Sequence, residues 1–320
     1  MSNFINQYVI SDSSIKKSIV VVYQEWLNKS KMRIKYSSFC IYDGIAQNHI
    51  LPYFNSYDIS DITREIVDSF IDCKLQSFAP KTVRDITSVL LQILKFAQRK
   101  GYISDFDYSI DLPRLQVNEL KIMSVTDEQK LNAYLKNNLN LENLGILLAK
   151  STGIRIGELC ALKWNDFDLI NGTVYISKTI QRVKNHDENA TSKTKVIITT
   201  PKSQKSVREI PLPDYIIPII KKLNKGANPN TYILTGTEKY MEPRNLQKKF
   251  KILLQSLDIM YVNFHSLRHL FATRAIESDF NIKALSEILG HSSVKITLDR
   301  YAHISFELKR SNMNKIASGF

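Results

Sequence analysis

The sequence predicts a mainly α-helical protein with a small antiparallel β-sheet, divided into two domains. Three observations lead to this prediction. Apolar residues recur at helical spacing in the first third of the chain and again after position 243, and three short segments between positions 172 and 213 alternate as strands do. A stretch with neither period separates the two parts. A length of 320 residues is enough for two separate hydrophobic cores.

The first domain, residues 1–103, is predicted as a bundle of about four helices. The apolar positions with helical spacing lie in three segments: Ile19–Leu27, Ile62–Ile71 and Leu90–Ala97. Pro80 suits the first turn of the last helix, where a missing N–H costs no hydrogen bond, and Gly101 suits its C-terminal end. Residues 104–124 show no clear period and contain a proline, so they are predicted as a linker.

The second domain, residues 125–320, is predicted to begin with a helix. Thr126 followed three residues later by Gln129 has the pattern of a capping box, in which the two side chains satisfy the first free N–H groups. Helical spacing then continues through Leu144–Lys150 and is expected to extend as far as Trp164.

The pattern next changes to period two. The segments GTVYISKTI, KVIITT and REIPLP predict three strands, with residues 201–207 as the turn between the last two and residues 181–195 as a long loop before that hairpin. Helical spacing returns after Pro243. The predicted helices are Asn245–Leu257, Ser266–Ser278, Ile282–Leu289 and a segment around Tyr301, before a short amphipathic tail.

Basic residues are concentrated in the second domain. Residues 1–120 contain 14 Lys and Arg against 13 Asp and Glu, whereas residues 121–320 contain 30 against 18. This excess favours a polyanionic partner such as DNA, RNA or a membrane surface, although a generic soluble surface remains the alternative on charge alone. The three cysteines lack metal-ligand spacing, and no apolar run suits a membrane span or signal peptide. The sequence therefore predicts reduced thiols in the core of a cytoplasmic protein.

Residues able to carry chemistry lie at four places in the second domain. They are Arg155, Lys202, His265 with Arg268, and His291 with Tyr301. Each has a structural explanation when taken alone: Arg155 could pair with Glu158 on its own helix, and Lys202 could be a solvated turn lysine. His265 and His269 have the spacing of two metal ligands on one helical face, but no third ligand is evident.

Taken together, the four segments resemble the tyrosine recombinase (phage integrase) family. TGIRIGELCALKWNDFD resembles its first arginine box, TPKSQKSVREIPLP its lysine hairpin, and HSLRHLFAT its His-x-x-Arg box. LGHSSVKITLDRYAHI resembles its closing box, in which histidine precedes tyrosine by ten residues. The resemblance covers residues from about 126 to 304 closely. It covers the N-terminal helices more weakly, as a helical core-binding (SAM-like) domain.

This resemblance implies a site-specific recombinase that cleaves and rejoins double-stranded DNA through a 3′-phosphotyrosyl intermediate. It implies that Tyr301 attacks phosphorus and that Arg155 and Arg268 grip the phosphate, for which planar guanidinium forks are well suited. His265 and His291 are expected to hydrogen-bond the phosphate oxygens or assist proton movement. Integration or excision of a mobile element is the leading biological role.

Lys202 is the expected general acid toward the leaving 5′ oxygen, with Lys205 as the second candidate. One phosphate ester replaces another, so no metal, ATP or other cofactor is expected. The expected substrate is a core site of inverted half-sites that binds a homodimer, with a homotetramer at synapsis, and an accessory directionality factor is a further candidate partner. The tail from Phe306 to Ile316 is expected to dock on a neighbouring protomer.

Three alternatives stay open: an Xer-like recombinase that resolves dimers or inverts DNA, a non-catalytic DNA-binding relative, and a type IB topoisomerase. The sequence also departs from the family pattern at two places. Leu270 stands where the family usually has threonine, which affects packing, and residues 181–195 lengthen the chain before the lysine hairpin.

Overall fold

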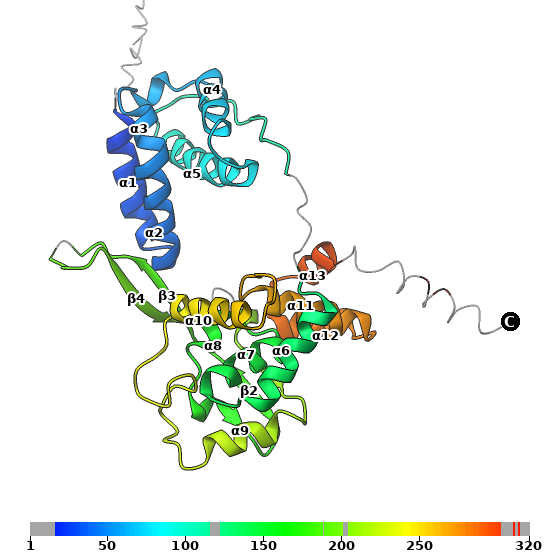
Figure 1. The fold of residues 1–320 in the computed structure, drawn as a ribbon. Helices are drawn as coiled ribbons and strands as arrows, with labels where there is room; N and C mark the ends of the chain where they lie inside the picture. The colour runs from blue at the N-terminus through cyan, green and yellow to red at the C-terminus, as the bar shows by residue number, and fades with distance from the viewer. Residues whose placement is uncertain are drawn as a thin grey trace, which may run out of the picture. The chain divides into compact units, whose positions relative to one another are not determined.

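The computed structural model describes residues 17–115, 122–187, 189–200 and 204–301, together with Arg310 and Met313. The chain forms two compact units, Met1–Asn118 and Glu119–Phe320, and each has its own hydrophobic core (Figure 1). The prediction of a mainly helical protein with small antiparallel sheets is confirmed. Within the described ranges, no helix is both long and apolar enough to cross a bilayer.

The first unit is a helical bundle whose core is rich in aromatic side chains. Its helices are α1 (Ile19–Lys31), α2 (Tyr36–Ile45), which continues through a π-helical turn (Ala46–Ile50) into α3 (Leu51–Phe54), α4 (Arg64–Leu75) and α5 (Pro80–Arg99). Pro80 opens α5 and Gly101 follows its end with a positive φ of 73°, as the sequence predicted. The predicted linker begins on this core, because Phe106 is buried there and Arg84 Nη1 donates to the carbonyl of Pro113 at 3.2 Å.

The second unit combines eight helices with two small sheets in its described residues. The helices are α6 (Val125–Asn137), α7 (Leu141–Thr152), α8 (Ile156–Leu159), α9 (Ile217–Asn224), α10 (Pro243–Ser256), α11 (Ser266–Glu277), α12 (Ile282–Leu289) and α13 (Val294–Tyr301). The strands are β1 (Phe167–Asp168), β2 (Thr173–Ile176), β3 (Thr179–Lys184), β4 (Thr194–Thr199) and β5 (Arg208–Pro211).

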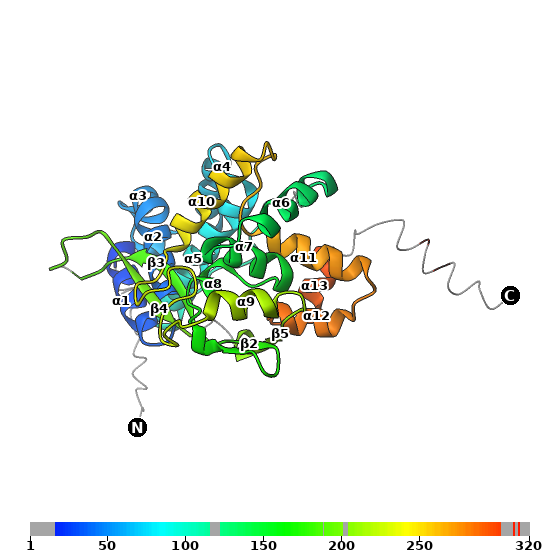
Figure 2. The same ribbon diagram turned by 60° about the horizontal axis from the view of Figure 1, so that its bottom comes forward.

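The strand predictions need correction. β2 lies between β1 and β5 in a three-stranded antiparallel sheet, in which Ile176 is opposite Arg208, whereas β3 pairs with β4 alone (Figures 1 and 2). The predicted strand 172–180 is therefore two strands in different sheets. The two ends of the predicted loop 181–195 are also strand, since β-branched pairs such as Ile180 opposite Ile198 stabilise a hairpin of β3 and β4. The predicted hairpin of the last two strands is therefore wrong, because β4 and β5 lie in different sheets.

Three helix predictions also need correction. The N-cap of α6 is Ser124, whose hydroxyl accepts from the Asp127 N–H at 3.1 Å, so the cap lies two residues before Thr126. The helix predicted to reach Trp164 ends at Thr152, because Gly153 adopts a left-handed conformation with φ of 65°. The short amphipathic helix α9 was not predicted.

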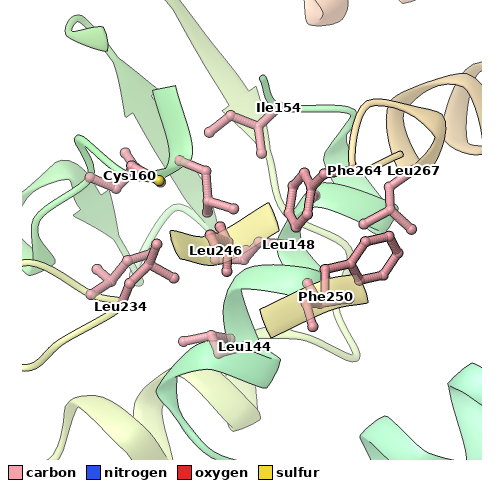
Figure 3. Close-up of a cluster of buried hydrophobic side chains, with 14 of the residues drawn as sticks. Leu144, Leu148, Ile154, Cys160, Leu234, Leu246, Phe250, Phe264 and Leu267 are labelled. Carbon is pink, nitrogen blue, oxygen red and sulfur yellow. The ribbon is translucent and has the colours of Figure 1, made fainter. Parts of the chain in front are cut away.

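The main core of the second unit anchors the segments that carry the candidate site (Figure 3). Leu144 and Leu148 of α7 are fully or almost fully buried among side chains of α10 and of the segment leading into α11. Ile154 and Leu267 belong to the same cluster, so the neighbouring Arg155 and Arg268 each follow a buried residue. The predicted burial of the cysteines is correct for two of them and wrong for Cys73, which is exposed.

Candidate active site

The C-terminal end of α12 brings three arginines together. Its last carbonyls lack donors within the helix and carry the negative end of the helix dipole, so they suit guanidinium groups. Three consecutive carbonyls each accept from a different arginine: Ile288 from Arg208 Nε at 2.5 Å, Leu289 from Arg268 Nη2 at 2.7 Å, and Gly290 from Arg155 Nη2 at 3.0 Å. We call residues 288–291 the α12 turn. Side chains from three distant parts of the chain therefore share one short segment.

The α12 turn depends on Gly290. This residue caps α12 in the left-handed conformation, with φ of 62°, which favours glycine. A Cβ atom at Gly290 would also lie 3.1 Å from both Cδ and Nη1 of Arg208. Any side chain at this position would push against the guanidinium that holds the turn.

Arg155 precedes the first turn of α8, where a positive charge opposes the helix dipole. Glu158 resolves this conflict within the same turn. Its carboxylate accepts from the Arg155 backbone N–H at 3.1 Å and from Arg155 Nη1 at 2.8 Å. The Arg155 side chain is 34% exposed, so its guanidinium is anchored yet accessible from outside.

Arg268 lies on α11 and is only 2% exposed. Its Nη1 donates to the carbonyl of Gly153 at 2.7 Å, in addition to the bond from Nη2 to Leu289. Gly153 is itself tightly enclosed, because a Cβ there would lie 2.6 Å from Phe271 Cδ1 and 2.7 Å from Leu289 Cδ2. One guanidinium thus joins the end of α7 to the α12 turn.

Glu158 lies between two arginines and is 2% exposed. Arg208 donates to it through both terminal nitrogens, Nη1 to Oε1 at 3.2 Å and Nη2 to Oε2 at 3.0 Å. Burial opposes ionisation of the carboxyl, but the positive charges and hydrogen bonds of Arg208 and Arg155 outweigh burial and lower the pKa of Glu158. Glu158 is therefore a carboxylate at neutral pH, and the three arginines with this one glutamate leave the cluster positively charged.

The histidines occupy two environments. His291 is 8% exposed, and its Nδ1 lies 2.7 Å from the hydroxyl oxygen of the buried Thr297, which fixes the orientation of the ring at the end of the α12 turn. His265 is exposed just before α11, and its ring packs edge-on against the buried His269 with centroids 4.7 Å apart. In the described part of the chain, no three His, Cys, Asp or Glu side chains gather as metal ligands.

Two predicted site residues are not placed by the structure. Lys202 lies outside the described residues, and Tyr301 ends α13 with a side chain that is also outside the described part. The second lysine candidate, Lys205, donates from Nζ to the carbonyl of Ser292 at 3.1 Å, next to the α12 turn. The structure thus brings Arg155, Arg268 and His291 together. His265 stands three residues before Arg268 in the sequence, and its ring packs on His269.

The sequence motifs did not single out Arg208. It stands within the segment TPKSQKSVREIPLP, whose candidate residues are the lysines. A signal was available, because Arg208, Ile210 and Leu212 alternate along β5 and are all buried, whereas Glu209 and Pro211 are exposed. The alternation of side chains along the strand therefore places Arg208 on its buried face, where a charged side chain needs partners for its charge and its N–H groups.

Comparison with protein families and their members agrees with the sequence motifs. The model of the Phage integrase family matches residues 114–307, and that of the phage integrase N-terminal SAM-like domain matches residues 20–75. A "Tyrosine recombinase XerC-like" protein of Caldanaerobacter subterraneus is 29% identical over 302 residues, covering 86% of this chain and 76% of the relative. The ICEBs1 integrase of Bacillus subtilis is 24% identical over 274 residues, covering 81% of this chain and 72% of the relative.

Solved structures share the fold. The integrase of transposon Tn1549, solved in complex with transposon right-end DNA, superposes with a TM-score of 0.78 at 19% identity, covering 94% of this chain and 100% of that chain. A lambda integrase tetramer bound to a Holliday junction gives a TM-score of 0.67 at 17% identity, covering 93% of this chain and 81% of that chain. The predicted SAM-like domain and the family resemblance are confirmed.

Proposed function

This chain belongs to the phage integrase family, and from that premise we propose that it is a site-specific DNA recombinase that integrates or excises a mobile element. One observation supports this proposal above all others. The guanidiniums of Arg155 and Arg268 meet beside His291 on the α12 turn, and the helix that follows this turn, α13, ends at Tyr301. Two positive forks on one turn suit a phosphodiester, whose cleavage needs charge neutralisation at the phosphate oxygens, and Tyr301 is the proposed nucleophile.

In the proposed reaction, the Tyr301 oxygen attacks phosphorus and the 5′ oxygen leaves, so that a 3′-phosphotyrosyl ester and a free 5′-hydroxyl form. Arg155 and Arg268 stabilise the charge that develops on the phosphate oxygens. Each guanidinium has five N–H donors, enough to keep bonds to the main chain while donating to phosphate. Because Arg268 is nearly buried, we expect DNA binding to shift the α12 turn and bring this fork to the phosphate.

Proton transfer falls to the remaining candidates. Lys202 is the proposed general acid for the leaving 5′ oxygen, with Lys205 as the alternative, and His265 and His291 donate to the phosphate oxygens or relay protons. The exchange of one phosphate ester for another needs neither ATP nor a metal ion. Adduct formation is therefore expected in the presence of excess chelator.

The names of relatives bear on the biological role. The ICEBs1 integrase and the Tn1549 integrase belong to mobile elements, which favours integration or excision. The relative described as XerC-like keeps an Xer-like, dimer-resolving recombinase as the second candidate. A plasmid that carries two copies of a candidate site distinguishes the two roles. A dimer-resolving enzyme recombines the two copies even when the plasmid contains no ends of a mobile element.

Trapping the covalent intermediate tests the proposed chemistry. A duplex nicked next to the cleavage point loses a short fragment after attack, so religation is prevented and the adduct accumulates. We expect a detergent-resistant protein–DNA band whose released fragment has a free 5′-hydroxyl that a kinase can label. Binding without any adduct would favour the non-catalytic relative. Relaxation of plasmids that lack a specific site would favour a type IB topoisomerase.

The proposed partner is double-stranded DNA with inverted core half-sites, bound by a homodimer that pairs into a tetramer at synapsis. The basic excess of residues 121–320 supports a DNA partner. A lambda integrase dimer has been solved on a core site and a tetramer on a Holliday junction, which supports this assembly. An accessory directionality factor remains part of the proposal.

Deleting the tail from Phe306 onward is expected to weaken cooperative assembly without weakening binding to one half-site. The reason is that this amphipathic segment, which lies mostly outside the described residues, is proposed to dock on a neighbouring protomer. Titrations on one and on two half-sites measure cooperativity directly. Equal cooperativity of the full and the shortened chains would contradict the proposed docking.

A further inference from the structure

Arg208 is the one arginine at the α12 turn to which the proposed reaction gives no task. Its side chain is 6% exposed, and each of its three nitrogens donates to a protein acceptor. A buried arginine carries a large desolvation cost that only several well-placed partners offset. The partners of Arg208 therefore indicate what this residue does.

Four hydrogen bonds distribute the guanidinium of Arg208 over three segments. Nε donates to Ile288 in the α12 turn, Nη1 donates to the Ser206 carbonyl at 3.0 Å and to Glu158, and Nη2 donates to the second oxygen of Glu158. Glu158 in turn holds both the backbone N–H and the side chain of Arg155. One side chain thus connects the start of β5, the start of α8 and the end of α12.

The same contacts align the arginines proposed to bind phosphate. Arg155 is held by Glu158 on one side and by Gly290 on the other, and Arg208 bonds to both of these holding segments. Arg268 bonds to Leu289, which adjoins the Ile288 carbonyl that Arg208 fixes. Moving Arg208 would therefore move the acceptors that orient both other guanidiniums.

From this geometry we propose that Arg208 is a positioning residue for the recombinase reaction: through Glu158 and the α12 turn it sets the orientation of Arg155 and Arg268 toward the scissile phosphate. The inference rests on the proposed function. In the proposed reaction, Arg208 contacts neither the phosphate nor the nucleophile. The carbonyl of Ser206, four residues after Lys202 on the chain, accepts from the same guanidinium.

The proposed role requires a fork and not only a charge. Lysine can satisfy one or two of these acceptors from a single nitrogen, but it cannot bridge both oxygens of Glu158 while also reaching Ile288. Arg208→Lys is therefore the informative variant, because it keeps the charge beside the buried carboxylate and limits the loss of stability. Arg208→Met removes the charge as well and serves as the more severe second variant.

The test measures single-turnover adduct formation on the nicked duplex with the full chain at saturating concentration. We expect Arg208→Lys to slow the reaction about 10²-fold, the usual effect of displacing a reacting group by about 1 Å, while the Kd for DNA stays within about twofold. Thermal unfolding of each variant shows that the assay temperature lies below its transition. Arg274→Met is the matched control, since Arg274 bonds to Glu128 and Glu277 and should react at the wild-type rate.

A double-mutant comparison separates positioning from a general loss of structure. If Arg208 acts through Arg155, then Arg208→Lys should cost less than about threefold in an Arg155→Lys background, because the orientation is already lost. Multiplicative effects of the two substitutions, or a wild-type rate for folded Arg208→Lys, would overturn the inference. Failure of the wild-type protein to form any adduct would instead refute the proposed function, so the two failures are distinguishable.

Discussion

Replacing Tyr301 with phenylalanine is expected to abolish the covalent adduct while leaving the affinity for DNA within about twofold. The phenol oxygen is the atom that becomes esterified to phosphorus, and the phenyl ring offers no substitute for it. In a serine protease, loss of the nucleophilic oxygen lowers the rate by about 10⁶-fold. The nicked duplex therefore shows no detergent-resistant band above background, whereas a mobility shift shows normal complexes.

Tyr261→Phe is the matched control for this substitution. Tyr261 lies in the same unit and is 55% exposed, and the same hydroxyl is removed there without any expected effect on cleavage. A preparation of Tyr301→Phe that still forms the adduct would place the nucleophile on another residue. Since every copy in that preparation carries the substitution, a neighbouring protomer cannot supply the missing oxygen.

Replacing Arg268 with lysine is expected to slow adduct formation by about 10² to 10³-fold at saturating DNA. This is the usual effect of removing one preorganised donor from a transition state. Arg268 already donates to Gly153 and Leu289 with two different nitrogens, and the single ammonium of lysine cannot keep both bonds and also grip a phosphate. The effect should appear in the single-turnover rate rather than in the Kd for DNA.

Arg274→Lys controls for the same change on the same helix, since both arginines belong to α11. Because Arg268 is 2% exposed, thermal unfolding must be measured for its variant, and some loss of stability is expected. A near-normal rate for Arg268→Lys in folded protein would show that its guanidinium has no contact with the phosphate. The residue would then serve only to join α7 to the α12 turn.

Local patterns predicted most secondary structure correctly. Helical spacing located α10 and α11 to within two residues at their ends and α12 without error, because an amphipathic helix repeats its buried positions along the chain. The two largest errors come from contacts between distant segments. Gly153 ends α7 in the left-handed conformation, with Phe271 and Leu289 packed where a Cβ would lie. The β3–β4 hairpin was likewise hidden, since strand pairing is a contact between segments.

The candidate site also contains features that the sequence predicted and features that only the structure revealed. Ordered motifs identified Arg155, Lys202, His265, Arg268, His291 and Tyr301, and the short-range contact between Arg155 and Glu158 was foreseen from their spacing. The partners of Arg208 were not foreseen. Period two shows which face of β5 is buried, but it contains no information about what lies opposite that face.

The sequence by itself therefore determined the family and the mainly helical fold, and it supplied the candidates for reactive side chains, because each is encoded in residue types at short, fixed spacing. Only the tertiary structure decided that three arginines share the carbonyls at the end of α12, and that Arg208 braces Glu158. Those bonds join residues 21 to 135 positions apart, and they form only after the cores of the second unit bring their helices and strands together.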